Sequence, residues 1–128
     1  DASENAGFTT GTPWIGIAGN YKAINAAAQM DAPDSIRSFY KTLVALRKKM
    51  PVISAGKIEF LYPDNADLLA YRRYGAEDGE ELLVLCNLTE HDAPYTLPEG
   101  WADADKLLGN YPDGNDALRP YECVVLKK

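Results

Sequence analysis

The pattern of apolar and polar positions divides the chain into three stretches. In residues 1–30 the apolar side chains follow no regular period. In residues 36–46 they recur at the spacing of one helix face. After Pro51, short apolar runs alternate with clusters of proline, glycine, asparagine and aspartate. The pattern therefore predicts a loop, one amphipathic helix and then an all-β module.

Residues 1–30 predict an irregular loop, with one short helical turn at residues 24–29. The residues that interrupt any regular element are Gly7, Gly11, Pro13, Gly16 and Gly19. A structureless stretch of this length is uncommon inside a compact domain. It is more typical of a functional lid or of a segment that packs against further protein.

The helix has a start signal, a stop signal and an apolar face. A polar segment with proline, residues 31–34, precedes it, and Pro51 ends it. The apolar face, here called the helix stripe, consists of Ile36, Phe39, Tyr40, Leu43, Val44 and Leu46. A stripe of this kind has to be covered by other protein.

The β module is predicted from runs of strand-forming residues that are separated by turn residues. The expected strands are residues 57–62, 68–74, 81–87, 93–97, 106–109 and 122–127. Short strands at such intervals favour an antiparallel sheet or a small sandwich.

Charge and hydropathy remove two classes of partner. The chain has 128 residues, and 13 Lys and Arg against 19 Asp and Glu give it a net charge of −6. This charge repels nucleic acid, and no apolar run is long enough to cross a bilayer. The first residue is Asp1 rather than methionine, which suggests a processed or designed fragment.

The metal-binding and thiol chemistry of the sequence is sparse. Cys86 and Cys123 each lie in an apolar run, which predicts reduced, buried thiols, with a disulfide between them as the alternative. Their spacing is not that of metal ligands, and the single histidine, His91, lies in a polar turn that predicts a surface residue. We therefore expect no metal and no cofactor.

The acidic residues are typical of turns rather than of a catalytic pair. Glu77, Asp78, Glu80 and Glu81 crowd one predicted hairpin turn. Residues 113–116, Asp-Gly-Asn-Asp, could offer oxygen ligands to calcium, but no closing bidentate acid follows, so a plain turn is favoured.

Four aromatic residues fall in or near predicted loops: Trp14, Trp101, Tyr111 and Tyr121. Exposed rings could form a platform on which sugars stack. Tyrosine and tryptophan near strand ends more often cover a core with one polar atom in water, and we favour this interpretation for all four.

Several segments resemble one enzyme family. Residues 1–11 (DASENAGFTTG), Pro13-Trp14-Ile15, Asn20-Tyr21 and Ile24-Asn25 resemble the loop after the eighth barrel strand of oligo-1,6-glucosidases, in glycoside hydrolase family 13, the α-amylase family. Residues 35–51 resemble the eighth barrel helix of that family. Leu82-Leu83-Val84, Asn87 and residues 118–122 resemble strands and a closing motif of its C-terminal domain. The resemblance covers essentially the whole chain.

The resemblance implies a mainly β fold with two parts. Residues 52–128 would form the antiparallel β-sandwich that is the C-terminal domain of an α-amylase-type enzyme. Residues 1–51 would be the last loop and helix of a truncated (β/α)8 barrel. The implied function is that of a non-catalytic C-terminal fragment of a cytoplasmic α-glucosidase, whose parent hydrolyses α-1,6 or α-1,4 bonds of oligosaccharides with retention.

Alternatives to this function remain open at this point. The sandwich could be a carbohydrate-binding module, or the parent could be a trehalose-6-phosphate hydrolase or a sucrose isomerase. The implied partners are the missing barrel and the oligosaccharide substrate of the parent. A homodimer through Ile36, Phe39, Tyr40 and Leu43 is a further alternative.

The resemblance carries no catalytic residue onto this chain, because the catalytic acids of the family lie upstream on earlier barrel strands. Glu4, Asn5 and Phe8 match the loop that borders the entrance of the sugar pocket. Residues 17–19, Ile-Ala-Gly, depart from the proline-containing pattern that the family has before Asn-Tyr.

Overall fold

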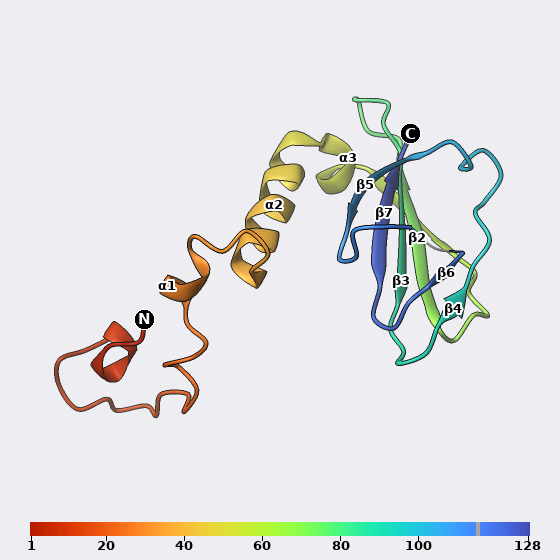
Figure 1. Ribbon diagram of the computed structural model, residues 1–128. Helices are drawn as coiled ribbons and strands as arrows, with labels where there is room; N and C mark the ends of the chain where they lie inside the picture. Colours follow the sequence, from red (N-terminus) through yellow and green to blue (C-terminus); the bar gives the residue numbers. More distant parts are fainter. Residues whose placement is uncertain (115) are drawn as a thin grey trace. The chain divides into compact units, whose positions relative to one another are not determined.

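The computed structural model describes residues 1–114 and 116–128 (Figure 1). The chain forms two compact units, Asp1–Lys48, here called unit 1, and Lys49–Lys128, here called unit 2. The sequence placed the boundary between residues 51 and 52. Among the described residues, no helix has the length and apolar character that are needed to span a bilayer.

Unit 1 is mostly irregular, with three short or isolated helical elements. A 3-10 turn, η1 (Glu4–Gly7), opens it, and α1 (Ala26–Gln29) lies within the helical turn that was predicted. The Asn25 side chain caps α1 by accepting a hydrogen bond from the Ala28 amide at 3.0 Å. The loop between η1 and α1 has no regular structure, as the glycine pattern predicted.

The long helix α2 (Ile36–Lys49) begins and ends where the sequence indicated. Ser35 caps its start, because its hydroxyl accepts a hydrogen bond from the Ser38 amide at 3.2 Å. No residue of α2 is buried. Ile36 keeps 71% of its surface exposed and Tyr40 keeps 64%, so the helix stripe is uncovered.

Pro51 has a second role that the sequence did not reveal. It ends α2, and it also opens a further helix, α3 (Pro51–Ser54), where its missing amide hydrogen costs nothing. Val52 of α3 is fully buried. The Arg73 guanidinium donates hydrogen bonds to the carbonyl oxygens of Val52 at 3.3 Å and Ile53 at 2.9 Å, which fastens α3 to the sheet.

Unit 2 is built on one five-stranded antiparallel sheet, in which β2, β3 and β7 lie side by side (Figure 1). The strands in spatial order are β1 (Lys57–Leu61), β2 (Leu68–Tyr74), β3 (Leu82–Asn87), β7 (Cys123–Lys127) and β5 (Asp105–Gly109). A second sheet pairs β4 (Ala93–Pro94) with β6 (Ala117–Leu118). The predicted mainly β, antiparallel fold is confirmed, and the strands do not close into a barrel.

The core of unit 2 lies on one face of the large sheet. Alternate residues of β2, β3 and β7 point to this face, as the period of two requires. The buried residues that form the core cluster are Leu68, Ala70, Leu83, Leu85, Trp101, Leu118 and Val124. Leu118 comes from β6, so the small sheet supplies part of the cover over this face.

The opposite face of the large sheet, here called the outer face, carries Ile58, Phe60, Leu69, Tyr71, Cys86 and Cys123. Phe60 is 63% exposed, and its ring meets the Tyr71 ring edge-on with centroids 6.1 Å apart. Ile58 is 48% exposed. On the same face, Leu82 and Val84 are buried. The outer face is therefore open along β1 and at Leu69, and covered over the first half of β3.

Candidate functional site

The three residues that the family resemblance selected lie together at the start of unit 1. Asn5 donates from its side-chain nitrogen to the carbonyl oxygens of Thr9 and Gly11, both at 3.1 Å. Its own φ is +53°, in the left-handed region that asparagine tolerates better than most residues. Asn5 thus holds the loop closed on itself and shapes the backbone of the site.

Glu4 and Phe8 line the same hollow, which has a volume of about 420 Å³. Phe8 also borders a larger hollow of about 760 Å³, whose wall includes Trp14 and Tyr21. The Phe8 ring is 86% exposed. The structure therefore brings a carboxylate and an open aromatic ring to one wall, with Asn5 as their backbone support.

Asp1 stabilises this loop from its N-terminal side. Its carboxylate accepts hydrogen bonds from the Ser3 amide at 2.8 Å and from the Ser3 hydroxyl at 2.5 Å. A side chain on Gly7 would be strained, because its φ is +76°, and a Cβ atom there would lie 2.7 Å from the Asp1 carboxylate, which would have to move. The glycine is therefore a requirement of the local geometry.

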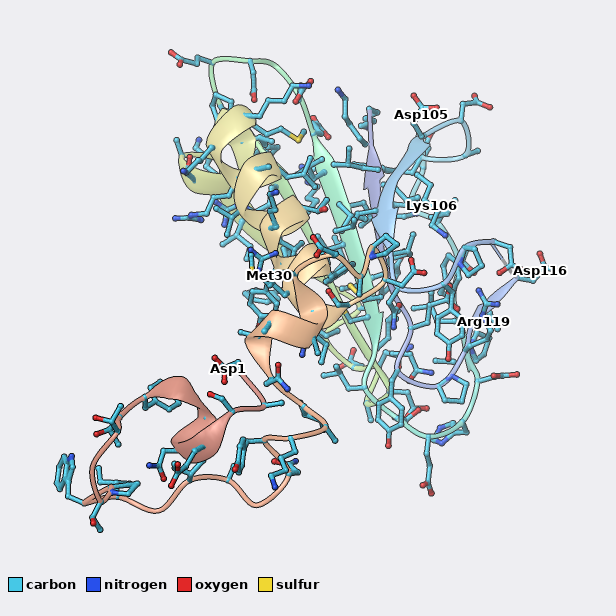
Figure 2. The ribbon with its side chains drawn as sticks, turned by 60° about the vertical axis from the view of Figure 1, so that its left-hand side comes forward. Asp1, Met30, Asp105, Lys106, Asp116 and Arg119 are labelled. Atoms are coloured by element: carbon cyan, nitrogen blue, oxygen red, sulfur yellow. The ribbon has the colours of Figure 1, made fainter. Side chains whose placement is uncertain are left out.

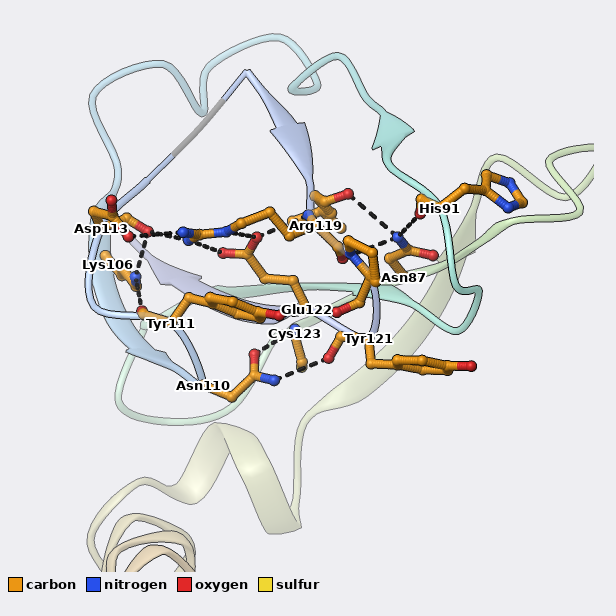
Figure 3. A network of polar contacts seen from close by, with 12 residues as sticks. Asn87, His91, Lys106, Asn110, Tyr111, Asp113, Arg119, Tyr121, Glu122 and Cys123 are labelled. Carbon is orange, nitrogen blue, oxygen red and sulfur yellow. Dashed lines mark hydrogen bonds and ion pairs between the residues drawn. The ribbon is translucent and has the colours of Figure 1, made fainter. Parts of the chain in front are cut away.

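A second group of polar residues lies in unit 2 and was not foreseen from the sequence (Figure 3). Its centre is Asn87, which is only 1% exposed. The side-chain amide of Asn87 donates hydrogen bonds to the carbonyl oxygens of His91 at 2.7 Å, Leu118 at 3.2 Å and Arg119 at 2.9 Å. Asn87 thereby joins the end of β3 to the segment that leads into β7.

An arginine, a lysine, a tyrosine and two carboxylates complete this group. We call the group the closing clamp, and its members are Asn87, Lys106, Tyr111, Asp113, Arg119 and Glu122. Glu122 is 3% exposed and accepts hydrogen bonds from Nε of Arg119 at 3.0 Å and from its Nη2 at 3.1 Å. The other side of the guanidinium donates to the Asp113 carboxylate at 2.9 Å. The guanidinium also lies over the Tyr111 ring, 4.0 Å from its centroid.

Lys106 binds to the same loop from β5. Its ammonium donates to the carbonyl oxygens of Tyr111 at 2.7 Å and Asp113 at 3.3 Å. Figure 2 shows the side chains of Lys106 and Arg119 on neighbouring segments of unit 2. Two cations, Lys106 and Arg119, therefore hold the carbonyl groups of Tyr111 and Asp113.

The electrostatics of the closing clamp favour ionised carboxylates. Hydrogen bonds from Arg119 lower the pKa of Glu122, although burial opposes this effect. Hydrogen bonds from Arg119 also lower the pKa of Asp113. A general acid needs a raised pKa to hold its proton near neutral pH. The clamp is therefore suited to holding the chain together rather than to donating protons.

Two acids of the predicted hairpin turn, Asp78 and Glu80, have structural partners. Asp78 accepts a hydrogen bond from the Val52 amide at 3.2 Å, and Glu80 forms an ion pair with Lys127. Asp113, which was weighed as a calcium ligand against the favoured plain turn, is paired with Arg119, and Asn115 of the same turn lies outside the described residues. Within the described part of the chain, no three His, Cys, Asp or Glu side chains gather as metal ligands.

The aromatic residues separate into two groups, which corrects the expectation that all four cover a core. Trp101 is 2% exposed and lies in the core, and Tyr111 lies beneath the Arg119 guanidinium. Trp14 and Tyr121 are instead 93% and 62% exposed. Trp14 lies in the irregular loop. Tyr121, whose φ is positive, lies in a tight turn just before β7. Neither ring covers a core.

The prediction for the single histidine and the two cysteines is also resolved by the structure. His91 is a surface residue whose ring nitrogen lies 3.3 Å from the Asp67 carboxylate. Cys86 and Cys123 are free thiols, but they are half-buried rather than buried. Their sulfur atoms lie 2.9 Å apart, a proximity that the wide separation in the sequence did not reveal.

Comparison with known proteins identifies the family. The α-amylase catalytic-domain profile matches residues 1–56. The trehalose-6-phosphate hydrolase of Bacillus subtilis is 41% identical over 99% of this chain and 24% of its own length. The oligo-1,6-glucosidase of Heyndrickxia coagulans is 42% identical over 98% of this chain and 22% of its own length.

Solved structures give the same result. The trehalose-6-phosphate hydrolase of Bacillus licheniformis matches with a TM-score of 0.87 and 38% identity, over 99% of this chain and 24% of that structure. A trehalulose synthase from Pseudomonas mesoacidophila matches with a TM-score of 0.88, 38% identity and the same coverage. The chain spans about a quarter of the length of these relatives. It belongs to the α-amylase family, glycoside hydrolase family 13, as a fragment similar to the oligo-1,6-glucosidases and trehalose-6-phosphate hydrolases.

Proposed function

We propose that this chain is a non-catalytic C-terminal fragment of an α-glucosidase, whose whole protein hydrolyses α-1,6 or α-1,4 glucosidic bonds of oligosaccharides with retention. Unit 1 contributes the last loop and helix of the catalytic barrel. Unit 2 covers and stabilises that barrel. Both roles require protein beyond these residues, and the matched relatives are about four times as long as this chain.

The observation that carries the proposal is the uncovered helix stripe on α2. A helix of 14 residues with no buried side chain gains little from its own chain, because most helix stability in proteins comes from packing of the apolar face. The stripe therefore indicates a surface that packs against the preceding barrel elements in the whole protein.

The chemistry of the acids supports the non-catalytic part of the proposal. Retaining glycosidases place a nucleophilic carboxylate about 5–5.5 Å from an acid whose pKa is raised. The carboxyl groups of the closing clamp, Asp113 and Glu122, instead share one guanidinium, which lowers the pKa of both. Ion pairing of this kind opposes the proton donation that the reaction needs.

The loop around Glu4, Asn5 and Phe8 is the part of this chain that we place next to substrate. Its hollow, its open aromatic ring and its nearby carboxylate suit the edge of a sugar pocket, where rings stack on sugars and acids accept hydroxyl hydrogen bonds. These residues would contact the leaving-group side of the oligosaccharide. Linkage preference depends on residues outside this chain.

Two alternatives for the parent come from the relatives themselves, whose names include trehalose-6-phosphate hydrolase and trehalulose synthase. Phosphorylated trehalose would require a cationic site that the loop around Glu4 does not provide. A sucrose isomerase parent would share the same fold and the same catalytic acids upstream of this chain. The choice between these activities is decided by substrate profiling of the whole protein.

A carbohydrate-binding role for unit 2 is the second candidate. A hollow of about 270 Å³ lies between Tyr62 and Tyr95, next to Asn65 and Thr96. Two rings with amide and hydroxyl groups beside them are suitable contacts for one sugar ring. Retention of this chain on immobilised maltooligosaccharide would support this role, and elution with the void volume would argue against it.

Homodimerisation is a third candidate, in which Ile36, Phe39, Tyr40 and Leu43 of one copy would cover those of another. Their exposed fractions, from 36% to 71%, permit such contact. We also propose a cytoplasmic location, which the two unbridged cysteines support, because reducing compartments keep thiols free.

The test of the main proposal compares this chain with the whole protein under identical conditions. Release of glucose is measured from isomaltose, p-nitrophenyl α-glucoside, trehalose 6-phosphate and sucrose. Activity only in the whole protein is the expected result, and the substrate that is cleaved fastest identifies the parent activity. Glucose release by this chain alone would show that acids which we assign to turns and ion pairs are catalytic.

A further inference from the structure

The two cysteines of the chain face each other across neighbouring strands in the middle of the large sheet. Cys86 lies on β3 and Cys123 on β7, and the register pairs them directly. Both side chains point to the outer face, and their sulfur atoms are 2.9 Å apart. They are separated by 37 positions in the sequence, so the sheet register alone brings them together.

The kind of strand pair at this position brings side chains unusually close. The backbone amide of Asn87 donates a hydrogen bond to the Glu122 carbonyl at 2.8 Å, so residues 87 and 122 are a hydrogen-bonded pair. Hydrogen-bonded and non-hydrogen-bonded pairs alternate along antiparallel strands, which makes Cys86 and Cys123 a non-hydrogen-bonded pair. Cα atoms of such pairs are about 4.5 Å apart, within the range of about 4.4–6.8 Å that disulfides span.

The surroundings hold the pair in place and leave it accessible. The side-chain oxygen of Asn110 accepts a hydrogen bond from the Cys123 amide at 2.8 Å, which fixes the start of β7 (Figure 3). Leu69, paired with Cys86 on the other side, is 39% exposed, and both cysteines are half-buried. A small reagent can therefore approach from the outer face without unfolding of the sheet.

The two thiols differ in how readily they ionise. The hydrogen bond that joins the two sulfur atoms lowers the pKa of Cys86, although burial opposes this effect. The same hydrogen bond, with burial and the charge of Cys86, strongly raises the pKa of Cys123. The attacking thiolate is therefore Cys86, and Cys123 stays protonated until the charge of Cys86 is removed.

We propose that Cys86 and Cys123 form a dithiol site that low-molecular-weight disulfides convert into a cross-strand disulfide between β3 and β7. The Cys86 thiolate attacks one sulfur of the external disulfide RSSR, whose S–S bond breaks and releases one RS⁻. Cys123 then loses its proton and attacks the Cys86 sulfur, which releases the second RS⁻. The two protein thiols are oxidised by two electrons, and RSSR is reduced to two RSH.

Removal of the Cys86 charge in the first step favours the second. Two of the causes that raise the pKa of Cys123, the hydrogen bond to Cys86 and the charge of Cys86, disappear when Cys86 is in a mixed disulfide. The short distance between the sulfur atoms makes the second attack intramolecular, so the mixed disulfide does not accumulate.

The experiment exposes this chain to oxidised and reduced glutathione in ratios from fully reducing to fully oxidising. Free thiols are then blocked by alkylation, and intact mass and peptide mass are measured. We expect both alkylation sites to be lost together, one crosslinked peptide pair that contains residues 86 and 123, and no glutathione adduct. An adduct that persists on one cysteine of the unmodified sequence would overturn the proposal.

Single variants test whether the second thiol resolves the mixed disulfide. C123S and C86S should each accumulate a stable glutathione adduct on the cysteine that remains, because the second attack is no longer possible. The order of attack is read from the unmodified chain, in which a sub-stoichiometric amount of iodoacetamide should label Cys86 several times as often as Cys123. Equal labelling of the two thiols would contradict the assigned order. Circular dichroism and urea unfolding confirm that each variant is folded before it is compared.

A measurement on the unmodified chain does not depend on variant folding. Phenylarsine oxide binds firmly only where two thiols can reach one arsenic atom. One equivalent should protect both cysteines from alkylation in the folded chain. Protection of neither thiol in the folded state would show that the sulfur atoms are not held together, and the proposal would fail.

Discussion

Units 1 and 2 contain similar apolar side chains but differ in how far these side chains are buried. In unit 2 Leu83, Leu85 and Trp101 are almost completely removed from water. Among the described residues of unit 1, Ala6 is the single apolar residue that is buried, while Trp14 and Ile36 are 93% and 71% exposed. Unit 2 therefore has its own core, whereas the apolar side chains described in unit 1 are mostly exposed.

The difference shows how an amphipathic pattern can be misjudged as a sign of autonomous folding. The helix stripe of α2 has the same sequence signature as a helix on a complete core. What distinguishes it is that no residue of α2 is buried, which agrees with the expectation from the family resemblance that its covering surface is missing from this chain. In unit 2 each strand has a neighbour, so the same kind of pattern leads to a closed core.

The largest expected effect is a difference in hydrogen exchange between the two units. Amides of β3 and β7 should exchange only through global opening of unit 2, whereas amides of residues 1–30 should exchange close to the rate of an unfolded chain. The measurement is amide exchange by mass spectrometry at low protein concentration. Strong protection of residues 1–30 in a dilute monomer would contradict the expected difference between the two units.

The second effect is the loss of core packing in unit 2. Leu85→Ala should destabilise unit 2 by about 2–5 kcal/mol, because Leu85 is fully buried and a cavity remains. Leu69→Ala, on the outer face of the adjacent strand, should cost less than half as much, because Leu69 is 39% exposed. Urea unfolding of both variants measures the difference, and equal costs would show that the outer face is covered.

The closing clamp gives the third effect. Asn87→Ala removes the donor that three carbonyl groups share, and we expect a loss of about 1–3 kcal/mol because buried acceptors are left unpaired. Asn110→Ala is the matched comparison: Asn110 is exposed and its side chain makes two hydrogen bonds to the backbone at the start of β7, so we expect a smaller loss. If the two variants were equally stable in urea, Asn87 would not be the centre of the clamp.

Acid should weaken unit 2 through the same clamp. The folded-state pKa of Glu122 is lowered, so its contribution is complete above the unfolded-state pKa of about 4.3 and is lost as the pH falls through the folded value. We expect the urea midpoint to fall between pH 5 and pH 3, and Glu122→Gln to make this fall smaller. A midpoint that does not change over this window in the unmodified chain would contradict the ion pair.

The smallest effect concerns the helix stripe itself. Tyr40→Ser should change the unfolding free energy of this chain by less than about 0.5 kcal/mol, because an exposed side chain has little to lose. Under the proposed packing of the stripe against the barrel, the same change should be several times more costly in the whole protein. Sedimentation at increasing concentration provides the control, because a dimer would make Tyr40→Ser matter in this chain as well.

Much of the fold could be predicted from sequence, because turn residues mark the ends of the strands. The expected strand at residues 68–74 agrees with β2 at both ends, and the expected strand at 81–87 differs from β3 by one residue. The strand expected at 93–97 is shorter, because Pro94 has no amide hydrogen for a longer ladder. The strand β6 was missed, since two residues have no period to detect.

The sites were harder to predict because their parts are distant in the sequence. The resemblance selected Glu4, Asn5 and Phe8, which are local neighbours, and their role at a sugar pocket stays a prediction. The contacts of Asn87 with three carbonyl groups, and of Cys86 with Cys123, depend on strand register and on the path of the loops. No local pattern contains that information.

The outer face sets a practical condition for anyone who wishes to produce unit 2 alone. An edge strand with open apolar side chains invites association of one molecule with another, and β1 is an edge strand that exposes Ile58 and Phe60. Replacement of these two side chains by lysine or threonine should keep the strand and improve solubility.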